Sequence, residues 1–180
     1  FGEFKDQTFK IVKILQEITT QTQEKIILYL KPQPMCHIID IAILLSRNIT
    51  VCCDFSYNIP DIQDIINFTN SGIVFTDNIN FLKQHNNHKI IVFYLGNEKD
   101  VTKYNNENQT VYNLTELLDT MDNQQDITLY PISQDMIAVI FFSSGTMGKP
   151  KGIVYTHKSL TSSVLSYNQA NVYNKNGGCL

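Results

Sequence analysis

Residues 135–160 read DMIAVIFFSSGTMGKPKGIVYTHKSL, and they give the strongest indication of architecture in the chain. The apolar run 136–142 is rich in β-branched and aromatic residues, which predicts a buried strand. A loop of serine, threonine, glycine and lysine follows it, and a second β-rich run, 153–156, leads to a helix expected to start near His157 or Lys158. Loops that leave the carboxyl end of such a strand are common ligand sites in α/β proteins.

Apolar runs and helical patterns alternate through the rest of the chain. Strands are expected at 25–30, 49–53, 73–75 and 89–95, and helices at 4–19, 35–46, 58–70, from Asp77 or Asn78 through Leu82, and 114–121. The polar stretches 96–110 and 122–135 are expected to be surface loops of one domain. Because strands alternate with helices, the predicted fold class is α/β, with a largely parallel sheet flanked by helices.

Composition excludes several classes of protein. The chain has 180 residues, of which 43% are hydrophobic and 17% are charged, so it is not a disordered charged tail. Its net charge of −3 favours neither nucleic acid nor anionic lipid as a partner. The apolar runs are far shorter than the roughly 20 residues that a membrane span requires. We therefore expect no nucleic-acid partner and no membrane span.

The cysteines and the chain ends carry weaker information. Cys52 and Cys53 are neighbours in a strand pattern, so they point to opposite faces and suit neither a metal pair nor a disulfide. We interpret the cysteines as buried thiols in a reducing cytosol and expect a cytoplasmic location, with no metal site among these residues. Because the chain starts at Phe1 and ends in the glycine-rich stretch 176–180, we expect it to be a segment of a longer protein.

The loop after the 136–142 strand contains three kinds of group that bind phosphate. Its glycines allow positive φ angles, so that successive backbone N–H groups can face one anion. Its hydroxyl groups donate hydrogen bonds, and its lysines supply positive charge. These residues are Ser143, Ser144, Gly145, Thr146, Gly148, Lys149 and Lys151.

The spacing of the loop is not that of a Walker A motif. Gly145 and Gly148 are too close together, and Pro150 stands where that motif has serine or threonine. A turn of this composition between two strands is more often only a turn. Composition alone therefore leaves two interpretations open, a phosphate site and a plain turn.

The order of residues in the loop adds a resemblance. Residues 143–152, SSGTMGKPKG, resemble the phosphate loop of the adenylate-forming superfamily, which includes acyl-CoA synthetases, coumarate-CoA ligases, firefly luciferase and peptide-synthetase adenylation domains. That pattern, Ser/Thr-Ser-Gly-Thr-Thr-Gly-x-Pro-Lys-Gly, fits everywhere except Met147, and the Thr-His pair at 156–157 follows as in the family. Weaker likeness to family segments extends over 1–4, 54–58 and 71–77.

The resemblance implies a reaction in two steps. ATP and a small-molecule carboxylate give an acyl-adenylate and pyrophosphate, and a thiol of coenzyme A or phosphopantetheine then accepts the acyl group. The loop would hold the β- and γ-phosphates of ATP, and Mg²⁺ would be a cofactor. Lys149 stands at the position of the motif that varies within the family, so it is a weaker candidate than the other residues. Residues 1–180 would be part of one large N-terminal adenylation domain, with the C-terminal remainder and lid domain absent. The catalytic residues are expected downstream of residue 180, so we expect this segment alone to be inactive.

Three functional alternatives stay open. The doubled serine 143–144 favours an acyl- or aryl-CoA ligase. The Asp-x-Ser-Tyr segment 54–57 favours an amino-acid adenylation domain with a carrier domain as partner. Met147, which removes a hydroxyl group near the phosphates, favours a truncated or degenerate relative without catalysis.

Overall fold

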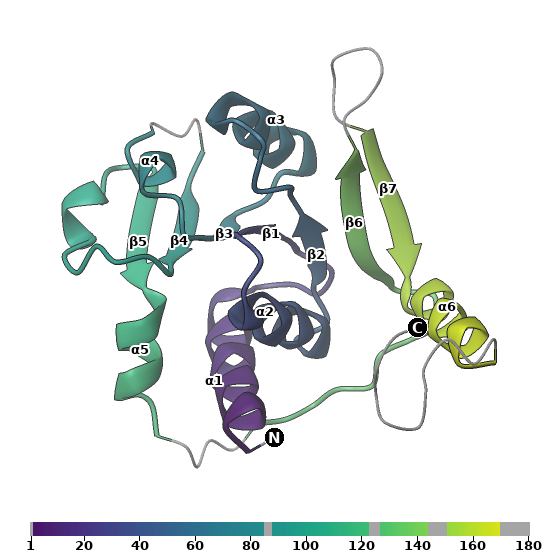
Figure 1. Cartoon of the computed structure of the whole chain (residues 1–180). Helices are drawn as coiled ribbons and strands as arrows, with labels where there is room; N and C mark the ends of the chain where they lie inside the picture. The colour runs from purple at the N-terminus through teal and green to yellow at the C-terminus, as the bar shows by residue number, and fades with distance from the viewer. Residues whose placement is uncertain (1, 85–87, 123–126, 144–150, 170–180) are drawn as a thin grey trace.

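The computed structural model describes residues 2–84, 88–122, 127–143 and 151–169, in which strands and helices alternate (Figure 1). The strands are β1 (Lys25–Tyr29), β2 (Ile49–Cys52), β3 (Ile73–Thr76), β4 (Ile90–Tyr94), β5 (Gln109–Asn113), β6 (Ile137–Ser143) and β7 (Lys151–Thr156). The helices are α1 (Gly2–Ile18), α2 (Pro34–Leu45), α3 (Ile59–Thr69), α4 (Ile79–Leu82), α5 (Leu114–Thr120) and α6 (His157–Gln169), with a 3₁₀ turn η1 (Thr102–Tyr104).

The described strands form one sheet in the order β5-β4-β3-β1-β2-β6-β7. Every neighbouring pair is parallel except β6 and β7, which are antiparallel. The prediction of an α/β fold with a largely parallel sheet is thus confirmed. Because β1 to β4 and β6 run the same way, their carboxyl ends share one edge of the sheet.

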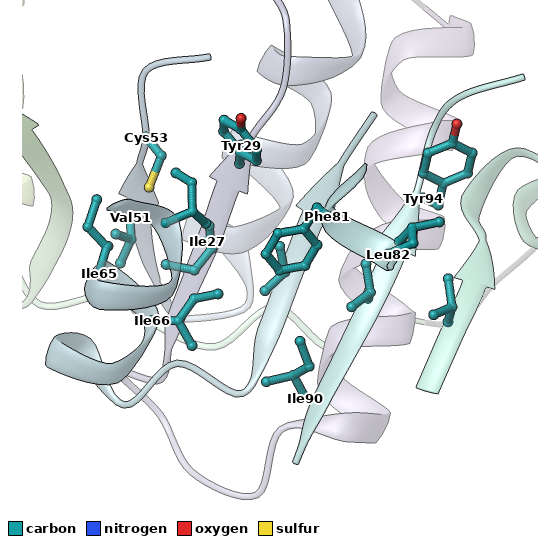
Figure 2. Packing of buried hydrophobic residues seen from close by; sticks show 14 of the residues in the cluster. Ile27, Tyr29, Val51, Cys53, Ile65, Ile66, Phe81, Leu82, Ile90 and Tyr94 are labelled. Carbon is teal, nitrogen blue, oxygen red and sulfur yellow. The ribbon is translucent and has the colours of Figure 1, made fainter. Parts of the chain in front are cut away.

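Helices cover both faces of the central strands. One buried cluster joins α1, α2 and α5 to one face of the sheet, and a second joins α3 and α4 to the other. Figure 2 shows the second cluster, in which Ile27 and Val51 of the sheet lie near Ile66 of α3 and Phe81 of α4. Burial on both faces explains why these strands read as continuous apolar runs rather than as alternating ones.

Asparagine side chains fix the starts of two helices. Asn58 accepts a hydrogen bond from the backbone N–H of Asp61 at 2.9 Å, and α3 begins immediately after it. Asn78, rather than Asp77, caps α4 by accepting from the N–H of Asn80 at 3.0 Å. Both contacts satisfy donors that a helix start leaves unpaired.

The prediction that 96–110 is only a surface loop was wrong. It contains η1, and β5 begins at Gln109 and pairs with β4. This edge strand alternates between buried and exposed residues, and its first buried residue is polar. The Gln109 side chain donates to the carbonyls of Leu82 and Tyr104, at 2.9 and 3.0 Å. Because β5 begins with a buried glutamine and follows a polar, Asn-rich stretch, it contains no apolar run from which a strand could be predicted.

Candidate phosphate-binding hairpin

The predicted site lies where β6 ends and β7 begins, at the edge of the sheet that the parallel strands share. The two strands form an antiparallel hairpin, in which Ser143 pairs with Lys151 and Phe142 pairs with Gly152 (Figure 1). The structure therefore places two of the seven predicted residues, Ser143 and Lys151, opposite each other at the base of the loop. The other five, Ser144, Gly145, Thr146, Gly148 and Lys149, lie outside the described residues and stay predictions.

Gly152 allows the base of this hairpin to pack closely. A Cβ atom at this position would lie 3.2 Å from Cγ2 of Ile140 and 3.3 Å from Cζ of Phe142, which is closer than ordinary packing. The neighbouring Lys151 is exposed and forms no ion pair with any residue that the structure describes. Its positive charge is thus free to attract an anion at the base of the loop.

A tyrosine from a distant part of the chain contacts the end of β6. The hydroxyl of Tyr57 donates to the carbonyl oxygen of Phe142 at 3.0 Å. Partial burial raises the pKa of Tyr57 above its ordinary value, with a smaller contribution from the charge of Asp54, so the hydroxyl keeps its proton at neutral pH. Nothing in the sequence indicated this contact except that Tyr57 lies in the segment 54–58, which resembles the family.

His157 does not belong to the same site. It is the first residue of α6, and it lies at the far end of β7 from Lys151, about 20 Å away for a strand of this length. Its backbone N–H donates to the carbonyl of Met136 at 3.1 Å. Burial lowers the pKa of His157, so the ring is neutral at pH 7. The interpretation of His157 as a packing residue at a helix start agrees with this position.

The described residues contain no group of three or more histidine, cysteine, aspartate or glutamate side chains that could hold a metal ion. Burial raises the pKa of the Cys52 thiol to about 12, and that of the buried Cys53 thiol is raised as well. Neither thiol is therefore a ready nucleophile. Within the described part of the chain, no helix combines the length and the apolar character needed to cross a membrane.

A family model described as "AMP-binding enzyme" matches residues 1–177 of the chain. The match includes the hairpin, the parallel sheet and the helices on both of its faces.

Two curated relatives are similar over shorter stretches. Nonribosomal peptide synthetase 9 of Aspergillus fumigatus is 38% identical over 55 residues, which are 31% of this chain and 5% of that protein. The probable CoA ligase CCL8 of Humulus lupulus is 47% identical over 49 residues, which are 26% of this chain and 8% of that protein. The matched segments are thus a small part of each relative's own length.

One similar solved structure is that of the N-terminal domain of FACL13 from Mycobacterium tuberculosis, determined with an inhibitor bound. It aligns with a TM-score of 0.70 and 16% identity, and the alignment covers 93% of this chain and 39% of that one. At this identity the likeness concerns the fold. The chain accounts for less than half of that domain.

Proposed function

The chain belongs to the AMP-binding enzyme family, and we propose that the protein is an acid–thiol ligase that uses ATP to activate a carboxylic acid. The first step forms an acyl-adenylate and releases pyrophosphate, and the second transfers the acyl group to the thiol of coenzyme A. The observation that carries the proposal is the family match together with a β6–β7 hairpin whose intervening sequence resembles the phosphate loop of that family.

The hairpin residues would bind the β- and γ-phosphates of ATP. Backbone N–H groups at the glycines and the hydroxyls would donate hydrogen bonds, each contributing about 1.5–3 kcal/mol to a charged acceptor. The ammonium group of Lys151 would supply positive charge, and Lys149 would make a smaller contribution of the same kind. We assign this binding to Ser143, Ser144, Gly145, Thr146, Gly148, Lys149 and Lys151.

Magnesium would enter with the nucleotide. Mg²⁺ typically takes its ligands from phosphate oxygens, water and one or two carboxylates. In the family that residues 143–152 resemble, the segment that serves adenine and magnesium comes later in the sequence, so we propose that the protein ligands of Mg²⁺, like the catalytic residues, lie downstream of residue 180. When bound, Mg²⁺ would neutralise part of the phosphate charge.

The chain would then be part of one large N-terminal adenylation domain, with a C-terminal remainder and a lid domain in the longer protein. The share of related proteins that it covers supports this proposal. We also propose a cytoplasmic location, because the described cysteines, Cys36, Cys52 and Cys53, are unpaired thiols.

A second candidate is an amino-acid adenylation domain that passes its product to a carrier domain. The similarity to a nonribosomal peptide synthetase and the segment 54–57 favour it. In that case the phosphopantetheine thiol of the carrier domain replaces coenzyme A as the acceptor.

The two candidates and a non-catalytic relative can be separated by one experiment. The full-length protein is incubated with MgATP and a panel of fatty, aromatic and amino acids, with and without coenzyme A, and the products are identified by mass spectrometry. A CoA ligase gives AMP, pyrophosphate and an acyl-CoA, whereas an amino-acid adenylation domain gives an aminoacyl-adenylate and no CoA thioester. Absence of AMP with every acid, or formation of ADP, would contradict the proposal.

A further inference from the structure

The hydrogen bond between Tyr57 and Phe142 comes where the regular pairing of β6 with the parallel sheet stops. The last pair between β2 and β6 is Cys52 with Phe141. One residue later, the Tyr57 hydroxyl donates to the Phe142 carbonyl, and Phe142 itself is only 9% exposed. Tyr57 thus fixes β6 immediately before Ser143, the residue at which the candidate phosphate loop begins.

Tyr57 is itself fixed by the ends of two further strands. The hydroxyl of Tyr29, the last residue of β1, donates to the carbonyl of Tyr57 at 2.8 Å. The side-chain amide of Asn78, which follows β3, donates to the same Tyr29 oxygen at 3.1 Å. In Figure 2 the Tyr29 ring lies at the end of its strand, with its oxygen directed away from the apolar cluster. The hydrogen bonds therefore run along the carboxyl edge from β3 to β1 and on to β6.

The turn that carries Tyr57 is held on both sides. The backbone N–H of Tyr57 donates to the carbonyl of Asp54 at 3.1 Å, and the backbone N–H of Ser56 donates to the Asp54 carboxylate at 2.8 Å. Hydrogen bonds from the side chain and then the backbone of Ser56 lower the pKa of Asp54, so the carboxylate is charged at neutral pH. Asn58 caps α3 on the other side. The Tyr57 ring therefore projects from an ordered segment.

We propose that Tyr57 is a positioning residue for ATP: its hydroxyl holds the Phe142 carbonyl and so fixes the end of β6, from which the candidate phosphate loop follows in the sequence. This inference depends on the proposed function, because it assumes that the loop binds ATP. A loop whose starting point is already fixed loses less conformational freedom on binding, and the nucleotide binds more tightly as a result. Tyr57 makes no contact with the reacting atoms in this role.

The test is the Kd of the full-length protein for MgATP, measured by isothermal titration calorimetry for the wild type and three tyrosine variants. Tyr57→Phe keeps the ring and removes only the hydroxyl, and we expect a Kd about three- to tenfold higher, as expected for one net hydrogen bond. Tyr29→Phe removes the hydroxyl that holds the Tyr57 carbonyl and does not itself contact β6, and we expect a smaller increase in the Kd than in Tyr57→Phe. Tyr112→Phe, on the distant edge strand β5, keeps its stacking on Phe93 and should leave the Kd unchanged.

The same variants separate positioning from a merely structural contact. In carboxylate-dependent pyrophosphate exchange, Tyr57→Phe should raise the KM for ATP and leave the KM for the carboxylate unchanged. Equal losses of ATP affinity in Tyr57→Phe and Tyr112→Phe would mean a general structural effect and would overturn the inference, as would an unchanged Kd in Tyr57→Phe. If the wild type itself does not bind MgATP, the proposed function fails and this inference fails with it.

Discussion

Phe75 and Phe141 are both strand phenylalanines, yet they lie in very different surroundings. Phe75, in β3, is fully buried and stacks on Phe93, with ring centroids 4.9 Å apart. Phe141, in β6, is 44% exposed, and Val154, in the neighbouring strand β7, is 53% exposed. The parallel block β1–β4 is covered by helices on both faces, whereas the hairpin β6–β7 is only partly covered. Stability is therefore concentrated in the block, and the candidate ATP site in the hairpin beside it.

This division of roles has a physical reason. A parallel sheet buried on both faces forms a rigid support, and a loop at its carboxyl edge can then present backbone N–H groups to a ligand. Binding elements are commonly drawn from the less stable parts of a fold. The Tyr57–Phe142 hydrogen bond connects the two regions of this molecule.

The largest effect is expected in the block. Phe75→Ala should lower the free energy of unfolding by about 3–5 kcal/mol, because it removes a buried ring and leaves a cavity. The matched change in the hairpin, Phe141→Ala, should cost less than about half of that, since its ring is partly in water already. Urea unfolding followed by circular dichroism measures both, and equal losses would contradict the contrast between the two regions.

The next largest effect is expected on self-association, through exposed apolar side chains of β7 and α6. They are Ile153, Val154, Val164, Leu165 and Tyr167. We expect residues 1–180, produced alone, to self-associate through these side chains and through the edge strand β7. The double variant Val154→Lys, Leu165→Glu should shift the segment toward monomer in analytical ultracentrifugation. A wild-type segment that is monodisperse and melts cooperatively would contradict this expectation.

The smallest expected effect is a pH dependence where helix α2 packs on the block. Burial raises the pKa of Asp40, although a hydrogen bond of 2.6 Å from the Thr50 hydroxyl and the charge of His37 act in the opposite direction. A carboxyl whose pKa is higher in the folded state binds its proton more tightly there, so its contribution to stability is present at low pH. That contribution is lost as the pH rises from the unfolded value near 3.9 through the raised folded value.

Asp40→Asn tests this sign, because asparagine keeps an oxygen that can accept from Thr50 and has no proton to lose. The stability of the variant relative to the wild type should increase from pH 4 to pH 7, as measured by urea unfolding at each pH. A relative stability that is constant or falls over this range would show that Asp40 does not titrate as its burial indicates.

The buried strands were predictable from sequence, and the edge strand was not. β1, β3 and β4 are continuous apolar runs because helices cover both faces of the sheet there, so their composition carries the signal. β6 is only partly covered, but it too was recognisable as an apolar run. β5 is enclosed on fewer sides, alternates in burial and begins with the buried Gln109, which reads as loop sequence. The second β-rich run predicted β7, whereas its antiparallel pairing with β6 is seen only in the structure.

The candidate site was predictable only where it is local in the sequence. Ser143 and Lys151 belong to one short motif, and the structure pairs them across the base of the hairpin. The contact of Tyr57 with Phe142 joins residues that are 85 positions apart. No periodicity or spacing in a single sequence indicates such a hydrogen bond, because it depends on how the parallel strands are ordered in the sheet.

The central claim, that the loop of the β6–β7 hairpin binds the phosphates of ATP, is tested most directly by carboxylate-dependent ATP–pyrophosphate exchange. The assay compares the full-length wild type with the double variant Thr146→Ala, Lys151→Ala, and uses Tyr112→Phe as the control. Loss of two groups that contact a charged phosphate, at about 1.5–3 kcal/mol each, predicts a fall in exchange of at least about 100-fold while the control stays at the wild-type rate. Exchange by the double variant at the wild-type rate would show that ATP is bound elsewhere.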